Sequence, residues 1–487
     1  MAVNLVPWVV IVACVQAMAN DEPWPDLLAA ESDAPRLTSS DAALVAAFDW
    51  ARTTALRHVG ADTDPVGPWY EAALPGREAF CMRDVSHQCL GAEVLGLARH
   101  NLNMMTRFAE GIAESRDFCS FWEINRHNLP APVDYASDDD FWYNLPANFD
   151  LLDACYRLYQ WTGNRAYLEG AAFDRFYRLT MTEYLDRWQL RPATVMHRPG
   201  MPNLRPTASR FAKSRGIPSY DEGQGELRLG SDLLGVMACA CRAYASMLTA
   251  RGRADEAGPY RLLATDYQRL LDTTWWDEAQ GAYYAFNTVD GRFYHGGVAN
   301  SEFLLWYQAI EQPARIRRAL SDIRNTQVEV LSYLPSLGWR YGQEDDAYRW
   351  LMLLPADARR DYPEASYAAV EAITTGMMGI EPSATEGLIR TCPRLARQTA
   401  WAAIEHVPVL GGLVSVGHRS NLATCFANKG DRPVVWRAMF RGAADTLLVD
   451  GQARAASRWV DAIGNEHAYV DVRVPGRAQS RAERPAK

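Results

Sequence analysis

The chain has 487 residues, of which 48% are hydrophobic and 22% are charged. At about 150 residues per domain, this length predicts two or three domains, or one large helical body with an accessory module. The composition excludes an intrinsically disordered chain and a bundle of membrane spans. The 50 Lys and Arg residues against 59 Asp and Glu give a net charge of -9 at pH 7. Because binding to a phosphate backbone needs a basic surface, we expect no nucleic-acid partner.

The first segment resembles an export signal. Residues 5–15 form an uncharged apolar run that is followed by the small residues Ala17 and Ala19. Eleven apolar residues are too few to span a bilayer, so residues 1–19 are predicted to be a cleaved signal peptide. We therefore expect a secreted or periplasmic protein without membrane insertion after cleavage. The Lys or Arg that usually precedes such a run is missing, and a buried segment of a cytoplasmic protein is the alternative.

Helical periodicity dominates the next part of the chain, from about residue 42 to residue 397. One helix is predicted to include residues 92–98 and to end near His100, and residues 104–109 belong to the next. Further helices are expected over residues 148–159, which Gly163 closes, and in the paired segments 232–251 and 255–274. The fold class is therefore predicted to be mainly α, a toroid of helical hairpins over residues 20–405.

Strand-like patterns indicate a second, smaller unit. One hairpin is expected within the helical body around Asp290 and Gly291. After Pro408 short β-rich runs follow one another between turn residues, which is typical of a small sandwich. We expect this C-terminal β-rich module to cover residues 406–475, and the polar residues 476–487 to form a disordered tail. The runs that carry these predictions are 282–287 and 292–295 for the hairpin, and 413–416, 424–427, 434–436 and 468–472 for the module.

The sequence lacks the common cofactor and metal motifs. There is no HExxH, GxGxxG, P-loop or GxSxG string, and no CxxC pair or Cys/His zinc spacing. We therefore expect no cofactor and no metal, and most of the cysteines are predicted to be small buried hydrophobes.

The first candidate site is a polar group at the start of a predicted helix, with Arg83, Asp84 and His87. An adjacent Arg–Asp pair can hold neighbouring sugar hydroxyls, because the guanidinium donates hydrogen bonds while the carboxylate accepts them. The alternative is that Asp84 or Ser86 only caps the helix.

The second candidate site is the run from Ser137 to Asp150, in which Asp140, Trp142, Tyr143 and Asn144 stand out. These residues offer acceptors, amide groups and two rings for stacking, the mixture that a sugar subsite needs. A solvated acidic loop, with Asn148 as a helix cap, is the alternative.

The third candidate site combines two distant segments, one with Glu222 and Glu226 and the other with Arg360 and Glu364. Cleavage of a glycosidic bond needs two carboxyl groups, one protonated to release the leaving oxygen and one ionised to activate water or attack carbon. Two acids on different loops of one rim would satisfy this need. Taken alone, a Glu in such a position is more often a first-turn helix residue that the helix dipole favours.

Taken in order, these features resemble the six-hairpin, (α/α)6-barrel glycosidases, a group that includes glucoamylases, trehalases, α-rhamnosidases and some β-glucuronidases. The resemblance spans about residues 45–440. The segments that carry it are Arg83 with Asp84, residues 141–144, residues 275–277 with 281–284, Asn300 with Ser301, and residues 375–382.

The resemblance implies an exo-acting hydrolase that releases a terminal sugar with inversion. Arg83 and Asp84 would bind the nonreducing sugar, Glu222 would be the general acid with Glu226 as its rival, and Glu364 would be the general base. No string of residues fixes either Glu, so Asp84 or Asp140 could be the acid instead. Because Arg83, Arg228 or Arg360 could pair with a substrate carboxylate, a uronic acid stays open beside rhamnose and neutral hexoses.

Three other functions stay open. A polysaccharide lyase would eliminate across a uronic acid, with Tyr143, Asn144 and His87 carrying the reaction. A sugar epimerase can also be built on such a toroid, although the predicted signal peptide disfavours it. A non-catalytic carbohydrate-binding protein would retain the toroid without its catalytic pair.

Overall fold

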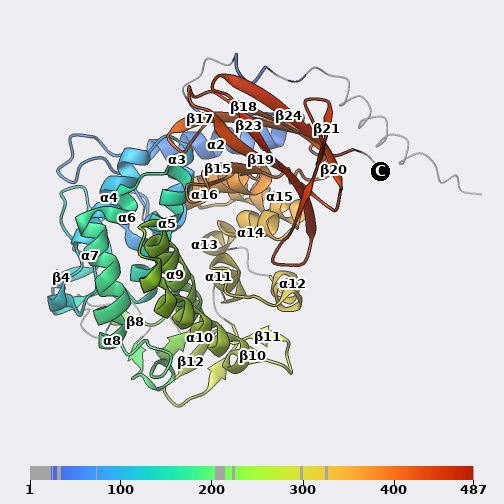
Figure 1. The fold of residues 1–487 in the computed structure, drawn as a ribbon. Helices are drawn as coiled ribbons and strands as arrows, with labels where there is room; N and C mark the ends of the chain where they lie inside the picture. Colours follow the sequence, from blue (N-terminus) through green and yellow to red (C-terminus); the bar gives the residue numbers. More distant parts are fainter. Residues whose placement is uncertain are drawn as a thin grey trace, which may run out of the picture.

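The fold is described from a computed structural model of the chain. It covers residues 24, 26–29, 34–72, 74–202, 214–221, 225–296, 300–323 and 327–485. The predicted signal peptide and Glu222 lie outside the described residues. The described part consists of a helical body and a β module, which lie beside each other (Figure 1).

Six helices of the body form a closed series of contacts. Each packs against the next, and the last returns to the first, so the helices surround a common centre. One of these six helices, α9, is buried on nearly all sides. It is apolar and long enough to cross a membrane, yet 72% of its most apolar stretch is buried inside the molecule, as in the core helix of a globular protein. In order of contact, the six are α3 (Met82–Val94), α5 (Pro146–Thr162), α9 (Ser231–Ala250), α11 (Asn300–Trp306), α14 (Leu334–Arg340) and α16 (Pro363–Glu371).

A second set of helices packs outside these six. The sequence explains their position, because their apolar residues lie on one face: in α4, Met104, Met105, Phe108 and Ala109 are buried at helical spacing. The outer helices are α2 (Ala42–Arg57), α4 (Ala98–Glu110), α7 (Ala171–Leu179), α10 (Gly258–Thr274), α12 (Pro313–Ser321) and α15 (Glu344–Leu353). Shorter helical segments are α6 (Ala166–Glu169), α8 (Leu185–Arg187), α13 (Val328–Leu331), η1 (Glu114–Arg116), η2 (Thr180–Tyr184), η3 (Val195–His197), η4 (Ala254–Ala257), η5 (Leu354–Ala356) and η6 (Ala372–Met377).

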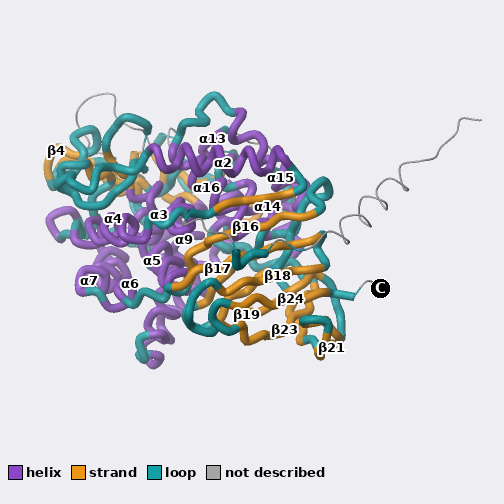
Figure 2. The backbone as a smooth tube through the Cα atoms, turned by 90° about the horizontal axis from the view of Figure 1, so that it is seen from above, coloured by secondary structure: helices purple, strands orange, loops and turns teal. Residues whose placement is uncertain are grey.

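Two larger sheets form the β module, which Figure 2 shows beside the helices. Between the sheets, the rings of Phe426 and Trp436 stack at 5.2 Å. The seven-stranded sheet runs in the order β1 (Arg36–Ser39), β16 (Trp401–Val409), β17 (Gly412–Arg419), β18 (Ala423–Asn428), β24 (Ala478–Glu483), β20 (Thr446–Val449) and β21 (Gln452–Ala455). The five-stranded sheet has the order β14 (Glu381–Ser383), β15 (Leu388–Thr391), β19 (Val434–Arg441), β23 (Glu466–Val474) and β22 (Ser457–Val460).

Short strands decorate the helical body. The expected hairpin around Asp290 and Gly291 is present, since β12 and β13 pair antiparallel there. Residues 282–283 of the predicted first strand instead form β11, which pairs with β10. These strands are β2 (Ala79–Cys81) with β3 (Glu123–Asn125), β4 (Tyr135–Ser137) with β5 (Asp140–Phe141), β6 (Tyr143–Asn144) with β8 (Arg215–Ile217), β10 (Trp276–Asp277) with β11 (Ala282–Tyr283), and β13 (Phe293–Tyr294), β12 (Phe286–Thr288), β9 (Glu226–Gly230) and β7 (Met201–Pro202) in one sheet.

Two predicted boundaries are wrong. The β module is not confined to residues 406–475, because β14 and β15 precede that range and β1 pairs with β16 from the other end of the chain. Residues 478–483 of the predicted tail form β24, which pairs with β18 and β20. A strand of alternating small and polar residues carries little hydrophobic signal of its own, and both of its neighbours are needed to define it.

One helix break is also displaced from its predicted place near His100. The first inner helix ends at Val94 and α4 begins at Ala98. Gly96 adopts a φ of 82° between them, a left-handed conformation that favours glycine. The cysteines follow the prediction, since all eight within the described residues are free and seven are buried.

Candidate active site

The N-terminal parts of α3, α5 and α16 meet at the centre of the helical body and bring charged residues together. Arg83, Asp84 and His87 come from α3, Asp150 from α5, and Glu364 from α16. Asp84 and Glu364 lie in the first turns of their helices, where unpaired backbone N–H groups and the helix dipole favour negative charge. These two carboxylates therefore lie where the helix ends stabilise them.

Arg83 and Asp84 form an ion pair at this centre. Arg83 Nε donates to Asp84 Oδ1 at 3.0 Å, and the guanidinium lies 5.3 Å from the ring centroid of Tyr220. Burial acts to lower the pKa of Arg83, but the negative charges of Asp84 and Glu364 outweigh it and raise that pKa well above its usual value. The Arg83 side chain is 20% exposed and that of Asp84 only 5%. The guanidinium is thus the part of the pair that solvent or a ligand can reach.

A chain of hydrogen bonds joins Glu364 to Asp150. The Tyr333 hydroxyl lies 2.9 Å from Glu364 Oε1 and 2.6 Å from His87 Nδ1. On the other side of the imidazole, His87 Nε2 lies 3.0 Å from Asp150 Oδ1, and Tyr220 donates its hydroxyl to Asp150 Oδ2. Because all five side chains are buried, these bonds fix the orientation of Glu364 relative to α3 and α5.

This chain can hold protons in two arrangements. Asp150 accepts from His87 Nε2, so Nδ1 is left to face the single hydroxyl proton of Tyr333. In one arrangement, Tyr333 donates to a neutral His87 and Glu364 carries a proton. In the other, His87 is an imidazolium that donates to Tyr333, and Tyr333 donates to an ionised Glu364. Both arrangements hold the same number of protons, so a proton can pass between Glu364 and His87 through Tyr333 without a change of heavy-atom geometry.

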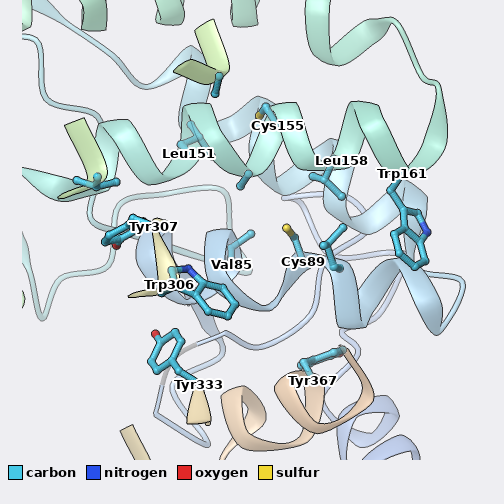
Figure 3. Packing of buried hydrophobic residues seen from close by; sticks show 14 of the residues in the cluster. Val85, Cys89, Leu151, Cys155, Leu158, Trp161, Trp306, Tyr307, Tyr333 and Tyr367 are labelled. Carbon is cyan, nitrogen blue, oxygen red and sulfur yellow. The ribbon is translucent and has the colours of Figure 1, made fainter. Parts of the chain in front are cut away.

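Aromatic rings surround the imidazole. Phe303, Trp306 and Tyr307 lie with their ring centroids 6.0–6.3 Å from that of His87. Figure 3 shows Trp306, Tyr307 and Tyr333 gathered beside Val85 of α3. A cavity of about 10 Å³ remains between these rings and Glu364, which is room for about one water.

A further buried carboxylate, that of Asp232 in the first turn of α9, anchors the loop that precedes this helix. Tyr220 N donates to Asp232 Oδ2 at 2.6 Å, and Asp221 N donates to Ser219 Oγ at 3.0 Å. Burial raises the pKa of Asp232 to about 7, while the hydrogen bonds from Tyr220 and Ser219 oppose this shift. The loop that precedes Glu222 is thus held against the first turn of α9.

Four of the predicted site residues lie in this cluster, namely Arg83, Asp84, His87 and Glu364. The predicted second group lies elsewhere in the body: Asp140 is in β5, and Trp142, Tyr143 and Asn144 are completely buried. Tyr143 donates its hydroxyl to Asn148 Oδ1, and Asn144 Nδ2 donates to the Ser219 carbonyl at 3.3 Å. The Tyr143 hydroxyl and the Asn144 amide nitrogen therefore make hydrogen bonds within the body.

Two other predicted residues are exposed. Glu226 lies at the start of β9, and the guanidinium of Arg360 lies 5.9 Å from the ring centroid of Trp50 on the outer helix α2. No described contact joins either residue to the central cluster. Glu222 lies outside the described residues.

Sequence reasoning missed Tyr333, and it included Asp150 in the second candidate run without assigning it a role. Asp150 is an acid inside an apolar helix pattern, which is a usable signal because a buried carboxylate needs a partner. Tyr333 carries no such signal: it lies 246 residues from His87 along the chain, and only the fold brings their side chains together.

Comparison with known proteins places the fold but not the family. No protein-family profile and no curated protein matches the sequence. An alpha-L-rhamnosidase from Dictyoglumus thermophilum superposes with a TM-score of 0.61 at 11% identity, covering 93% of this chain and 50% of the rhamnosidase. The GH78 family rhamnosidase of Bacillus sp. GL1 gives a TM-score of 0.53 at 15% identity, with 81% and 40% covered.

A third solved structure, described as a putative kojibiose phosphorylase from the human microbiome, gives a TM-score of 0.56 at 9% identity, covering 91% of this chain and 63% of the phosphorylase. The chain spans about half the length of the first rhamnosidase. At identities of 9–15% these likenesses concern the fold alone. The chain therefore has a glycoside hydrolase-like fold, with a helical body followed by a β module.

Proposed function

We propose that the protein is an exo-acting glycoside hydrolase built on an (α/α)6 toroid, and that it removes a terminal sugar with inversion. The closed series of six inner helices supports the toroid. The observation that carries the activity is the position of Glu364, which is held by Tyr333 at the same centre as the Arg83–Asp84 pair. A uronic acid, rhamnose and a neutral hexose are the candidate sugars.

In this proposal Glu364 is the general base. Tyr333 and Ser332 hold one carboxylate oxygen, at 2.9 and 3.4 Å, and the cavity beside Glu364 has room for about one water. An inverting hydrolase needs a water on the face of the sugar opposite the leaving group, activated by a carboxylate. Arg83 and Asp84 would bind sugar hydroxyls, with Arg83 as the more accessible group.

The general acid would come from the loop before α9. Glu222 is the leading candidate, because Asp232 fixes the backbone of Tyr220 two residues earlier. Its rival Glu226 is exposed on β9, and Asp84 is already paired with Arg83. These contacts favour Glu222 over Glu226 and Asp84, and the third alternative, Asp140, lies in β5 away from the central cluster.

A lyase reaction through Tyr143, Asn144 and His87 receives less support. Tyr143 donates its hydroxyl to Asn148 and is completely buried, whereas His87 belongs to the network of Tyr333 and Asp150. A base and an acid for elimination must reach the same sugar ring. We also propose, from the apolar run at residues 5–15 and Ala19, that the protein is exported.

The test is a panel of aryl glycosides and oligosaccharides, including rhamnosides, glucosides and glucuronides, with reducing sugar and ultraviolet absorbance read together. Release of one monosaccharide without a rise in absorbance supports the hydrolase. A rise shows the unsaturated product of a lyase, and binding of sugar without turnover supports a carbohydrate-binding protein.

Glu364→Gln then tests the assigned residue on the substrate that the panel identifies. We expect kcat to fall by about 10²–10⁴-fold, the usual contribution of a general base, while circular dichroism shows an unchanged fold. Glu311→Gln, an exposed glutamate beyond α11, is the matched control and should retain full activity. Full activity of Glu364→Gln would refute the assignment.

A further inference from the structure

A second cavity lies outside the central cluster, between α11, α12 and the β10–β11 hairpin. Its volume is about 170 Å³, far larger than the space beside Glu364. Carbohydrate and other small-molecule sites combine aromatic walls with a few convergent polar groups. This cavity has both, since Trp276, Tyr283, His295, Ser301, Glu302 and Asp322 are among its lining residues.

The cavity is separate from the candidate active site. Both sites use α11, but successive residues of a helix point about 100° apart. Phe303 faces the centre, where its ring lies 6.1 Å from that of His87. Glu302, one residue earlier, lines the outer cavity together with Ala319 and Ile323 at the end of α12. A ligand here would therefore not occupy the place of the sugar at Glu364.

Glu302 is the unusual residue of this cavity. Only 8% of the residue is exposed, and burial raises its pKa, while a hydrogen bond from its own backbone N–H opposes this shift. Within the described parts of the chain, no other residue donates a hydrogen bond to its carboxylate. A carboxylate has two oxygens that can each accept more than one hydrogen bond, so a buried carboxylate with this single donor gains free energy when a ligand supplies another.

The other titratable groups of the cavity already have partners. His295 Nε2 lies 3.0 Å from Asp277 Oδ2, and His295 Nδ1 lies 3.1 Å from the Tyr283 carbonyl, so both ring nitrogens face acceptors. Asp322 is paired with Arg318 at 2.8 Å. Glu302 is thus the charged acceptor that is left for a ligand, beside the polar side chains of Gln280 and Ser301.

The other charged groups around the cavity neutralise one another. Arg315 lies over the ring of Trp276 at 4.3 Å and pairs with Asp272 at 3.2 Å, and Arg318 pairs with Asp322 at 2.8 Å. The rings of Trp276 and Tyr283, whose centroids are 4.9 Å apart, offer an apolar wall, which suits the apolar face of a neutral sugar.

We propose that this cavity is a second carbohydrate-binding site, in which a hydroxyl group of a neutral sugar donates to Glu302 while the sugar packs against Trp276 and Tyr283. The site would hold a sugar residue of a glycan independently of the chemistry at Glu364. Its existence does not depend on the proposed hydrolase activity.

The test places a reporter in the cavity. The protein is labelled with 5-fluorotryptophan, the Trp276 resonance is assigned by its loss in Trp276→Phe, and D-glucose, L-rhamnose, D-glucuronate and D-glucosamine are titrated in turn. We expect a saturable shift of the Trp276 resonance with at least one neutral sugar. Glu302→Gln should raise the dissociation constant about tenfold or more, because a hydrogen bond to a charged group is lost. The control Glu311→Gln should leave it unchanged.

Two further measurements distinguish a sugar-binding site from a cavity that binds no ligand. The shift should persist in Glu364→Gln, since the two sites are independent. Glu302→Gln should also raise the melting temperature of the ligand-free protein, because the buried charge is removed. A response to glucosamine alone, a shift that Glu302→Gln leaves unchanged, no shift with any sugar, or a lower melting temperature of Glu302→Gln would each overturn the proposal.

Discussion

Replacing Asp232 with asparagine is expected to change how the stability of the protein depends on pH. Asp232 is 4% exposed, and burial raises its pKa from 3.8 to about 7. Between pH 3.8 and about pH 7, Asp232 therefore holds a proton in the folded protein that it releases in the unfolded chain. The stability contributed by this proton is therefore fully present below about pH 3.8 and is lost as the pH rises through about 7.

The size of the effect follows from the same two values. A pKa difference from 3.8 to about 7 corresponds to about 4 kcal/mol, at 1.36 kcal/mol per pKa unit. The substituted asparagine does not ionise, yet its Oδ1 can still accept the hydrogen bond that Tyr220 N donates in the native protein. Relative to wild type, Asp232→Asn should thus gain up to about 4 kcal/mol between pH 4 and pH 8. In a chain of 487 residues this corresponds to about 4 °C in melting temperature.

Calorimetry of both proteins at pH 4 and pH 8 is the assay. Glu93→Gln is the matched control, because burial also raises the pKa of Glu93 to about 7, and Glu93 lies near the opposite end of α3 from the candidate site. Both variants should gain stability at high pH. Only Asp232→Asn should alter turnover, since Asp232 holds the loop that leads to Glu222. An equal difference from wild type at pH 4 and pH 8 would refute the reasoning.

Two further predictions test the network and the β module. Tyr333→Phe should lower kcat by about 10–100-fold with little change in KM, because Glu364 loses a charge-assisted hydrogen bond of about 1.5–3 kcal/mol; steady-state kinetics on the identified substrate would show it, and wild-type turnover would contradict it. Truncation after Pro475 should lower the melting temperature and promote association, because the loss of β24 exposes the edges of β18 and β20; calorimetry and size-exclusion chromatography measure this, and an unchanged monomer with the same melting temperature would argue against it.

The sequence predicts the fold best where the local signals agree. Residues 148–159 form the middle of α5, and Gly163 ends this helix with a φ of 71° as expected. The prediction fails between α3 and α4, because residues 92–98 are apolar apart from Glu93 and Gly96 gives the only sign of a break among them. Packing against the other inner helices, and not local propensity, determines where α3 ends.

The candidate site also contains some residues that the sequence predicts and others that it does not. Arg83, Asp84 and Glu364 are recognisable in the sequence, since each is a charged residue at the start of a predicted helix. Tyr333 is not, because its role depends on a contact with His87 that only the closed series of helices creates. Trp142 illustrates the opposite error of interpretation: an aromatic residue in a polar loop suggested a stacking platform, yet its side chain is completely buried. Composition alone does not tell a binding ring from a core ring.

Two opposing effects act on every carboxylate near the centre of this fold. The N-terminal ends of the inner helices favour the ionised form, whereas burial favours the protonated form. Where a neighbour donates to the carboxylate, as Tyr333 does to Glu364, the structure compensates the charge. Where burial outweighs the donors, as at Asp232, the pKa rises to about 7. A hydrolase that uses one ionised and one protonated acid needs both environments within a single site. Inner helices whose first turns are buried supply both environments. The base is therefore expected among the carboxylates that accept hydrogen bonds from neighbours, and the acid on the loop that Asp232 anchors.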